Sequence, residues 1–311
     1  MHAQVGDWLV IPPAPHEPRT RPAVLVAVDG SDSSVQAARW ASDLRFGERP
    51  NLRLACVVPE ASSPPEAPKW LTELSADLRG GGTENEVSLI AATDIGAELA
   101  RLSGEVDLLV VGSYGEGSGG GVQVGSTALR LLDSATCPVA VVRGRESDSP
   151  VPDGGFVVAG VDCSPESVSA LALAAELAEG WGAKLLVVHT WRDVADEPGR
   201  GVYRLPENWD KMASDAAALL AVAVDAVQAG HPDLSIERRV VADGPLSALL
   251  DVASGARVVV VGSRGARPRP GMLMGSTSRG LVEFSPCPVL VVRPQAGRSA
   301  RRLATAQSGV G

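Results

Sequence analysis

Two glycine-rich segments of the chain have the residue types and spacing of a phosphate-binding loop. The first is Gly112-Ser113-Tyr114-Gly115, followed after nine residues by Gly125-Ser126-Thr127. The second is Gly262-Ser263-Arg264-Gly265, followed after nine residues by Gly275-Ser276-Thr277. Each follows an aliphatic run typical of a buried strand, and the order strand, glycine loop, helix lets backbone N–H groups surround a phosphate. The sequence therefore predicts two phosphate sites.

The positions within each segment have separate roles in such a site. The first two glycines let the backbone approach ribose and phosphate without an intervening Cβ. The Gly-Ser pair that closes the segment presents N–H groups and a hydroxyl at a helix start, where the helix dipole favours anions. A tight strand–helix turn without a ligand is the alternative interpretation. The predicted contact residues are Gly112, Gly115, Gly125, Ser126 and Thr127, and in the second segment Gly262, Arg264, Gly265, Gly275, Ser276 and Thr277.

The elements that position these segments also occur twice in one order, which indicates an internal duplication. Strands apolar on both faces that alternate with helices predict a parallel α/β sheet with helices on both faces. We expect Ser33 or Ser34 to be the N-cap of the first helix. The expected strands of the first repeat are 24–28, 52–58, 87–91, 107–111 and 139–142, and its helices are 33–44, 70–78, 95–102 and 126–134. Those of the second are strands 157–161, 185–189, 236–241, 258–261 and 289–292, and helices 167–179, 210–228, 246–253 and 276–284.

The length of 311 residues fits two domains. We expect a flexible, proline-rich arm over 1–21, a first domain over 22–145 and a Ser/Asp/Pro/Gly linker over 146–154. A second domain follows over 155–294, and 295–311 forms a flexible tail. The second repeat is longer than the first, mostly between Thr190 and Met212, and this insertion is a candidate ligand lid or interface.

Composition narrows the function classes. The net charge of −9 and the pI of about 5.0 argue against a nucleic-acid partner, which needs a basic face. The four cysteines form no C-x-x-C pair, so a zinc site is not expected, and Cys137 and Cys287 are predicted to be small core residues. The start of the chain has no basic region or long apolar stretch, so we expect a cytoplasmic protein without membrane contact.

These blocks together resemble a tandem universal stress protein. The matching features are Val28-Asp29-Gly30-Ser31 and Val161-Asp162-Cys163-Ser164, both glycine loops, and both Cys-Pro-Val-x-Val-Val-Arg ends, over residues 22–294. The resemblance implies two tandem five-stranded parallel open sheets of strand order 3-2-1-4-5, each Rossmann-like and binding an adenine nucleotide. In such a sheet the ligand lies beside the switch between strands one and four.

The resemblance also implies further contact residues. Asp29 and Asp162 correspond to the aspartate that contacts the nucleotide, and either could help to hold Mg²⁺. Their alternative role is to N-cap the following helix. Val57 and Thr190, at the end of strand two, would line the adenine pocket, or would simply pack there.

The two predicted sites differ in charge. The second loop carries Arg264, Arg267 and Arg269, which could pair with phosphates, whereas the first carries Tyr114 and Glu116. We expect the second repeat to bind ATP more tightly, the alternative being that these arginines lie on a solvated surface loop.

The resulting functional hypothesis is a stress or signalling module that binds ATP, with or without Mg²⁺. A regulatory protein partner would recognise this module. A slow ATPase or adenylate-transferring enzyme is the first alternative, and a scaffold without nucleotide is the second. No Ser-His-Asp arrangement or carboxylate pair is readable, and His189 is expected to serve packing. Strands 139–142 and 289–292 would be exposed sheet edges, so each is expected to pair with its counterpart or with another chain, and a homodimer of tandem chains is expected.

Overall fold

The structure, a computed structural model, describes residues 21–59, 67–114, 124–143, 155–191, 209–266 and 273–293. The predicted arm, linker and tail lie outside these ranges, apart from Arg21. Most of the longer segment between Thr190 and Met212 also lies outside them.

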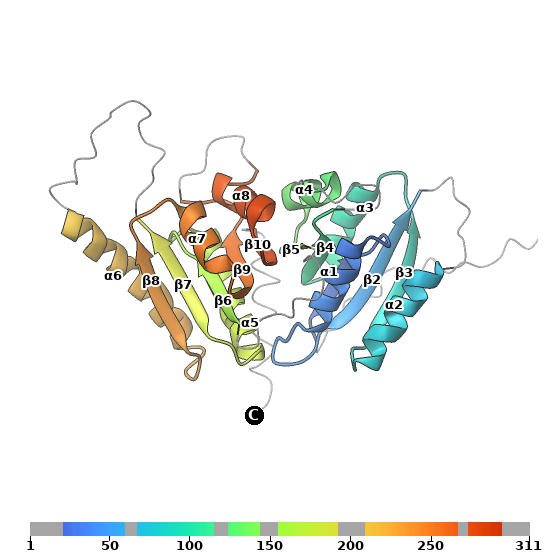
Figure 1. The fold of residues 1–311 in the computed structure, drawn as a ribbon, viewed down its shortest axis with the longest axis horizontal. Coiled ribbons are helices and arrows are strands. Elements are labelled where there is room, and N and C mark those ends of the chain that lie inside the picture. The colour runs from blue at the N-terminus through green and yellow to red at the C-terminus, as the bar shows by residue number, and fades with distance from the viewer. Residues whose placement is uncertain are drawn as a thin grey trace, which may run out of the picture.

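Each repeat forms alternating strands and helices, as the sequence predicts (Figure 1). The first repeat consists of β1 (Ala23–Ala27), α1 (Asp32–Ser42), β2 (Asn51–Val58), α2 (Lys69–Gly80), β3 (Asn85–Ala91), α3 (Ile95–Leu102), the short 3₁₀ helix η1 (Ser103–Glu105), β4 (Leu108–Gly112), α4 (Ser126–Ser134) and β5 (Val139–Val142). The second consists of β6 (Phe156–Gly160), α5 (Pro165–Gly180), β7 (Leu185–Thr190), α6 (Trp209–Gln228), β8 (Ile236–Val241), α7 (Pro245–Ala253), β9 (Ala256–Gly262), α8 (Ser276–Phe284) and β10 (Val289–Val292).

The strands of both repeats form one sheet of ten strands in the order β3-β2-β1-β4-β5-β10-β9-β6-β7-β8. Within each repeat the order is the expected 3-2-1-4-5 and every pairing is parallel. The two five-stranded halves do not form separate sheets as expected, because β5 and β10 pair antiparallel and join them. Each of these strands therefore covers the edge of its counterpart, and the expectation of a homodimer stays a prediction.

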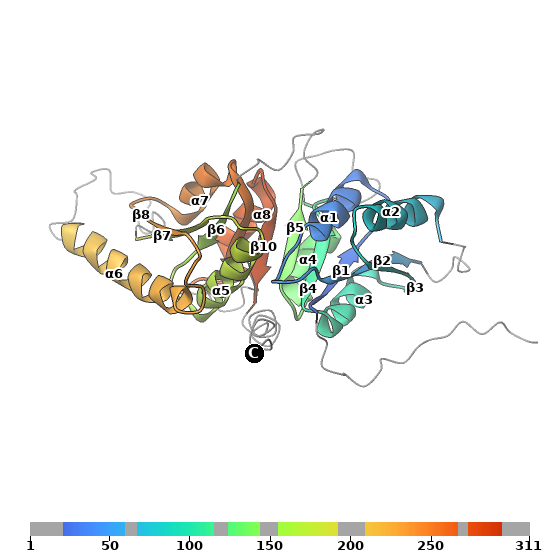
Figure 2. The same ribbon diagram turned by 90° about the horizontal axis from the view of Figure 1, so that it is seen from below.

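Helices cover both faces of this sheet, and each face has its own apolar core that runs through both repeats. On one face α1, α2, α5 and α6 bury side chains such as Leu71 and Leu171. On the other face α3, α4, α7 and α8 bury side chains such as Leu131 and Leu281. Figure 2 shows the helices on either side of the continuous sheet. Cys137 and Cys287 are each 1% exposed, which confirms that they are core residues, and burial raises the pKa of Cys137 to about 12.

The N-cap of α1 is Ser31, so the prediction of Ser33 or Ser34 was wrong. The side chain of Ser31 accepts a hydrogen bond from the N–H of Ser34 at 3.2 Å. Ser164 has the same role for α5 and accepts from the N–H of Ser167 at 3.2 Å. Three serines lie within four positions here, and N-cap propensity does not distinguish between them. The N-cap therefore lies two or three residues earlier than predicted.

Two arginines fasten the repeats to each other. Arg293, directly after β10, donates from Nη1 to the carbonyl of Ala135 at 3.0 Å, which ends α4 of the other repeat. Arg143, directly after β5, donates to the carbonyl of Glu283 in α8. A helix C-terminus carries partial negative charge, so a guanidinium there is favourable. Burial lowers the pKa of both arginines, although Glu283 raises that of Arg143 and Asp133 raises that of Arg293.

The α1 and α5 ends form a second contact between the repeats. Trp40 and Trp181 meet edge-to-face with ring centroids 6.4 Å apart, and Trp181 Nε1 donates to the carbonyl of Asp43 at 2.6 Å. Arg257 lies over the Trp181 ring, 4.8 Å from its centroid. Gly180 lies directly against the backbone of Arg45, and a Cβ at Gly180 would overlap it.

Replacing Arg293 by glutamine should lower the free energy of unfolding by about 1–2 kcal/mol, because a buried carbonyl at the end of α4 loses its charged donor. Urea unfolding followed by circular dichroism measures the change. Lys211→Gln, which removes an exposed pair with Asp215 at 3.0 Å, is the control and should change stability by about 0.5 kcal/mol or less. Equal effects of the two substitutions would contradict a structural role for the cross-repeat contact.

Candidate functional site

Each repeat brings its aspartate and its glycine loop together at the carboxyl ends of two adjacent strands. β1 lies between β2 and β4, and β6 lies between β7 and β9, so the direction of winding reverses at β1/β4 and at β6/β9. Asp29 follows β1 and Gly112 ends β4, while Asp162 follows β6 and Gly262 ends β9. Ligands of open α/β sheets bind in the crevice at such switch points.

In the first repeat the aspartate is held by the helix start beside it. Asp29 accepts two hydrogen bonds on Oδ1, from the N–H of Ser31 at 3.0 Å and from its hydroxyl at 2.6 Å. The hydroxyl of Ser33 accepts from the N–H of Tyr114 at 3.3 Å, which fastens the start of the loop to α1. Because Ser31 is the N-cap, the alternative role of Asp29 as N-cap was wrong. Its side chain is exposed at the crevice.

In the second repeat the loop closes on the aspartate. Asp162 accepts from the N–H of Ser164 at 3.1 Å and from its hydroxyl at 2.6 Å, as in the first repeat. It accepts a further bond on Oδ2 from the N–H of Ala266 at 2.7 Å. A Cβ at Gly265 would lie 2.7 Å from the same oxygen, so only glycine leaves room for this contact. Burial raises the pKa of Asp162, but the bonds from Ser164, Ala266 and Ser167 outweigh it and hold the pKa below its ordinary value.

The helix that follows each loop begins without a side-chain cap. Gly125 is the N-cap of α4 and Gly275 is the N-cap of α8, and no side chain of the described residues caps either start. Each of these glycines donates its N–H to the first serine of its loop, to the carbonyl of Ser113 or of Ser263, at 2.7 Å. Ser126 and Ser276 are exposed, and Thr127 and Thr277 are half-buried. Each helix therefore begins with a glycine N-cap and an exposed serine.

Close packing explains the first glycine of each motif. A Cβ on Gly112 would lie 2.8 Å from the carbonyl carbon of Ser33 and 2.9 Å from the nitrogen of Ser34. A Cβ on Gly262 would lie 2.8 Å from Cβ of Glu166. These glycines allow the loop to cross the start of the first helix of its repeat, so packing alone already requires glycine at both positions.

The charged residues of the second site pair with each other. Arg264 Nη2 lies 3.3 Å from Oε1 of Glu166, a carboxylate at the start of α5 that the sequence analysis did not single out. Burial lowers the pKa of Arg293, and the nearby positive charge of Arg264 lowers the pKa of Arg293 further. Ser33 is the counterpart of Glu166 in the first repeat, and Tyr114 is the counterpart of Arg264.

The remaining predicted residues lie at the border of the site or outside the described ranges. Val57 follows Ala55, the partner of Ala27, by two residues in β2, and Thr190 follows Val188, the partner of Gly160, by two residues in β7. Continuing this register places them level with the two aspartates, half-buried. Gly115, Glu116, Arg267 and Arg269 lie outside the described residues.

His189 packs, as expected. Its side chain is 8% exposed and Nδ1 lies 2.6 Å from the carbonyl of Val161.

The hydroxyls that hold the aspartates were missed by the sequence analysis. Their signal was present, since Asp-x-Ser-x-x-Ser occurs at both positions, 29–34 and 162–167. Within the described ranges, no helix is both long enough and apolar enough to cross a bilayer.

Substituting Gly112 by alanine should lower the free energy of unfolding by about 1–3 kcal/mol, because the new methyl group overlaps the backbone of α1. Chemical unfolding gives the value. The control is Gly80→Ala at the end of α2, where a Cβ meets nothing within 4 Å and alanine favours the helix. If the two alanines are tolerated equally, the close approach at Gly112 is not a constraint.

The stabilisation that Asp162 provides should depend on pH. A carboxylate whose folded pKa is depressed stabilises the protein above its unfolded pKa, about 4, and loses that contribution as the pH falls through the folded value. The gap in unfolding free energy between the wild type and Asp162→Asn should therefore be largest near pH 6–7 and shrink below about pH 4. Urea titrations at stepped pH measure it, and a gap that is constant down to pH 3 would contradict the assignment.

Comparison with known proteins identifies the family. The model of the universal stress protein family matches residues 21–143 and 156–293. A universal stress protein of Mycolicibacterium smegmatis is 33% identical over 298 residues, which cover 89% of this chain and 98% of that protein. One from Mycobacterium tuberculosis is 30% identical over 298 residues and covers 89% and 99%.

The fold is also similar to that of a solved universal stress protein structure. The crystal structure of a universal stress protein from Archaeoglobus fulgidus superposes with a TM-score of 0.64 at 19% identity, over 88% of this chain and 98% of that one. The two family matches together span both described repeats, and the relatives match along nearly their whole length. The chain therefore belongs to the universal stress protein family and carries two of its domains in tandem.

Proposed function

We propose that this protein binds an adenine nucleotide, ATP, at the crevice of each repeat and acts as a nucleotide-dependent stress or signalling module. The observation that carries the proposal is the pair of helix starts at Gly125 and Gly275. Among the described residues no side chain caps either start, and both helices follow the strand at the switch point of the sheet, where a serine hydroxyl also holds the aspartate. Uncapped helix N-termini of this kind favour phosphate because of their dipole and their unsatisfied donors.

The aspartates suit the other end of the ligand. In each repeat the serine at the helix start occupies Oδ1 and fixes the carboxylate. A carboxylate fixed in this way can accept from a ribose or adenine donor without first losing side-chain freedom. In the second repeat the ligand would replace or share the bond from Ala266 to Asp162, so binding there would move the start of the loop.

The second site would bind more tightly under this proposal, because Arg264 offers a guanidinium where the first loop has Tyr114. Its pair with Glu166 is 3.3 Å long and 39% of the Arg264 side chain is exposed. A phosphate would therefore compete with a single carboxylate for a partly exposed arginine. Loop ordering by the nucleotide would change the surface that a protein partner reads.

Aspartate in place of Gly275 or Gly125 should block the respective site. The new side chain caps the helix and places a negative charge where the phosphate would lie, at a cost of about 4 kcal/mol for two unit charges 4 Å apart at the effective dielectric constant of a protein surface. Isothermal titration with ATP and Mg²⁺ should show at least about a ten-fold loss of affinity at that site. Gly275→Asp should remove the stronger site.

The matched controls are Gly275→Asn and Gly125→Asn, which have the same shape and capping ability without the charge. They should weaken binding clearly less than the aspartates do. Equal effects of both residue types would mean that the site holds no phosphate. If the wild type shows no saturable binding of millimolar ATP, the proposed function is wrong, and release of ADP from bound ATP would instead indicate an enzyme.

A further inference from the structure

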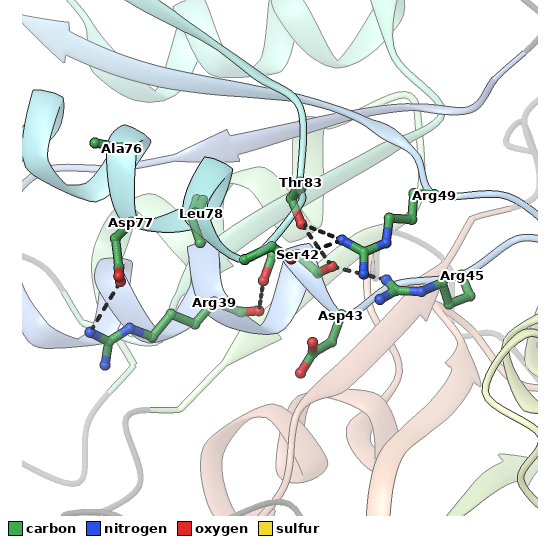
Figure 3. Close-up of a pocket in the computed structure, with 11 residues that line it drawn as sticks. Arg39, Ser42, Asp43, Arg45, Arg49, Ala76, Asp77, Leu78 and Thr83 are labelled. Atoms are coloured by element: carbon green, nitrogen blue, oxygen red, sulfur yellow. Dashed lines mark hydrogen bonds and ion pairs between the residues drawn. The ribbon is translucent and has the colours of Figure 1, made fainter.

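A pocket of about 650 Å³ opens at the other end of the first repeat, where α1 and α2 end (Figure 3). α1 starts at the carboxyl end of β1 and returns to the amino end of β2, so this pocket is separated from the glycine loops by the length of the helix. Its lining contains three arginines, Arg39, Arg45 and Arg49, and two carboxylates, Asp43 and Asp77.

The structural role of two of these arginines uses only one nitrogen of each. Arg45 donates from Nη1 to the carbonyls of Ser42 at 2.9 Å and Leu44 at 2.7 Å, at the end of α1. Arg49 donates from Nη1 to the carbonyl of Gly82 at 2.7 Å and to the Thr83 hydroxyl at 3.2 Å, beyond the end of α2. Neither Nε nor Nη2 of these two arginines has an acceptor within the described part of the chain. That edge of a guanidinium is the one that can bind an oxyanion through two parallel hydrogen bonds.

The two guanidinium groups lie side by side (Figure 3), and no carboxylate of the described ranges lies within 4.0 Å of either. Asp77 is engaged with Arg39 at 3.7 Å. Burial lowers the pKa of Arg45, and the nearby charges of Arg49 and Arg257 lower it further, while Asp43 opposes them. In a chain with a net charge of −9, this is a local excess of unpaired positive charge in a concave site.

Contacts with the second repeat also fix the position of Arg45. Its backbone contacts Gly180 at the end of α5, and the backbone carbonyl of Asp43, two residues earlier, accepts a hydrogen bond from Trp181 Nε1 at 2.6 Å. Arg49 is held by the loop after α2. A pair of arginines that is already ordered loses little conformational freedom when it binds a ligand.

We propose that this pocket binds a dianionic oxyanion, namely phosphate or the phosphoryl group of a small metabolite, between the open edges of Arg45 and Arg49. A dianion neutralises both guanidiniums together, which a monocarboxylate does not. The volume leaves room for a small organic group beside the phosphoryl group. The site adjoins the contact between the repeats and is independent of the nucleotide crevices.

Phosphorus-31 NMR of inorganic phosphate, and separately of glycerol 3-phosphate, titrated with the full chain at constant ionic strength, tests this proposal. Saturable line broadening is expected, and tighter binding of the ester would show that the organic group contributes. Arg45→Gln together with Arg49→Gln should weaken binding at least about ten-fold, because two bidentate donors are lost. The matched control, Arg238→Gln with Arg279→Gln, makes the same charge change at exposed pairs elsewhere and should change binding less than about two-fold.

Two further variants separate this site from the nucleotide crevices and from misfolding. Gly125→Asp with Gly275→Asp should leave the phosphate binding in place, whereas Arg45→Gln with Arg49→Gln should leave ATP binding unchanged. If the glutamine pair unfolds, Arg45→Lys with Arg49→Lys keeps both charges but loses the planar fork, and should weaken phosphate binding several-fold. The proposal is overturned if the wild type does not saturate at about 20 mM phosphate, if the arginine variants bind like the wild type, or if the loop variant abolishes the binding.

Discussion

The antiparallel pairing of β5 with β10 is the constraint on which the rest of the structure depends. Ala140 pairs with Leu290, and Val139 and Val141 pair with Val291 and Val289. Equivalent strands of the two repeats thus pair with each other in opposite directions. This is the isologous geometry of a two-fold dimer, formed here within one chain. Since each strand was the open edge of a half-sheet, the pairing satisfies both rows of backbone donors and acceptors at once. It also extends each apolar core across both repeats.

This pairing gives the arginine at the end of each Cys-Pro-Val motif its function. Because β5 and β10 run in opposite directions, the end of one strand lies near the end of the helix that precedes the other. Arg143 and Arg293 therefore reach carbonyls of α8 and α4 in the opposite repeat. These helices begin at the glycine loops, so each candidate nucleotide site rests on a helix whose far end is held by the other repeat.

Much of the fold was readable from the sequence because its information is local and repeated. Aliphatic runs, glycine loops and the two Asp-Gly/Cys-Ser positions recur in register, and they place both candidate sites at the carboxyl ends of adjacent strands. What the sequence left open depends on long-range geometry. An apolar edge strand does not specify whether it pairs with its counterpart or with another chain. The pair of Arg264 with Glu166 joins positions 98 residues apart, and no local pattern signals it.

The arginines at helix ends show how placement separates structure from binding. Arg143 and Arg293 sit on carbonyls between the repeats, where burial lowers their pKa. Arg45 and Arg49 sit on carbonyls in the same way, at the ends of α1 and α2, but at the wall of an open pocket. The capping contacts use one nitrogen and hold the side chain in place, and they leave Nε and Nη2 without an acceptor among the described residues. A residue that stabilises a helix end can in this way become a preorganised donor for a ligand, provided that the neighbouring surface stays concave and lacks a carboxylate within pairing distance.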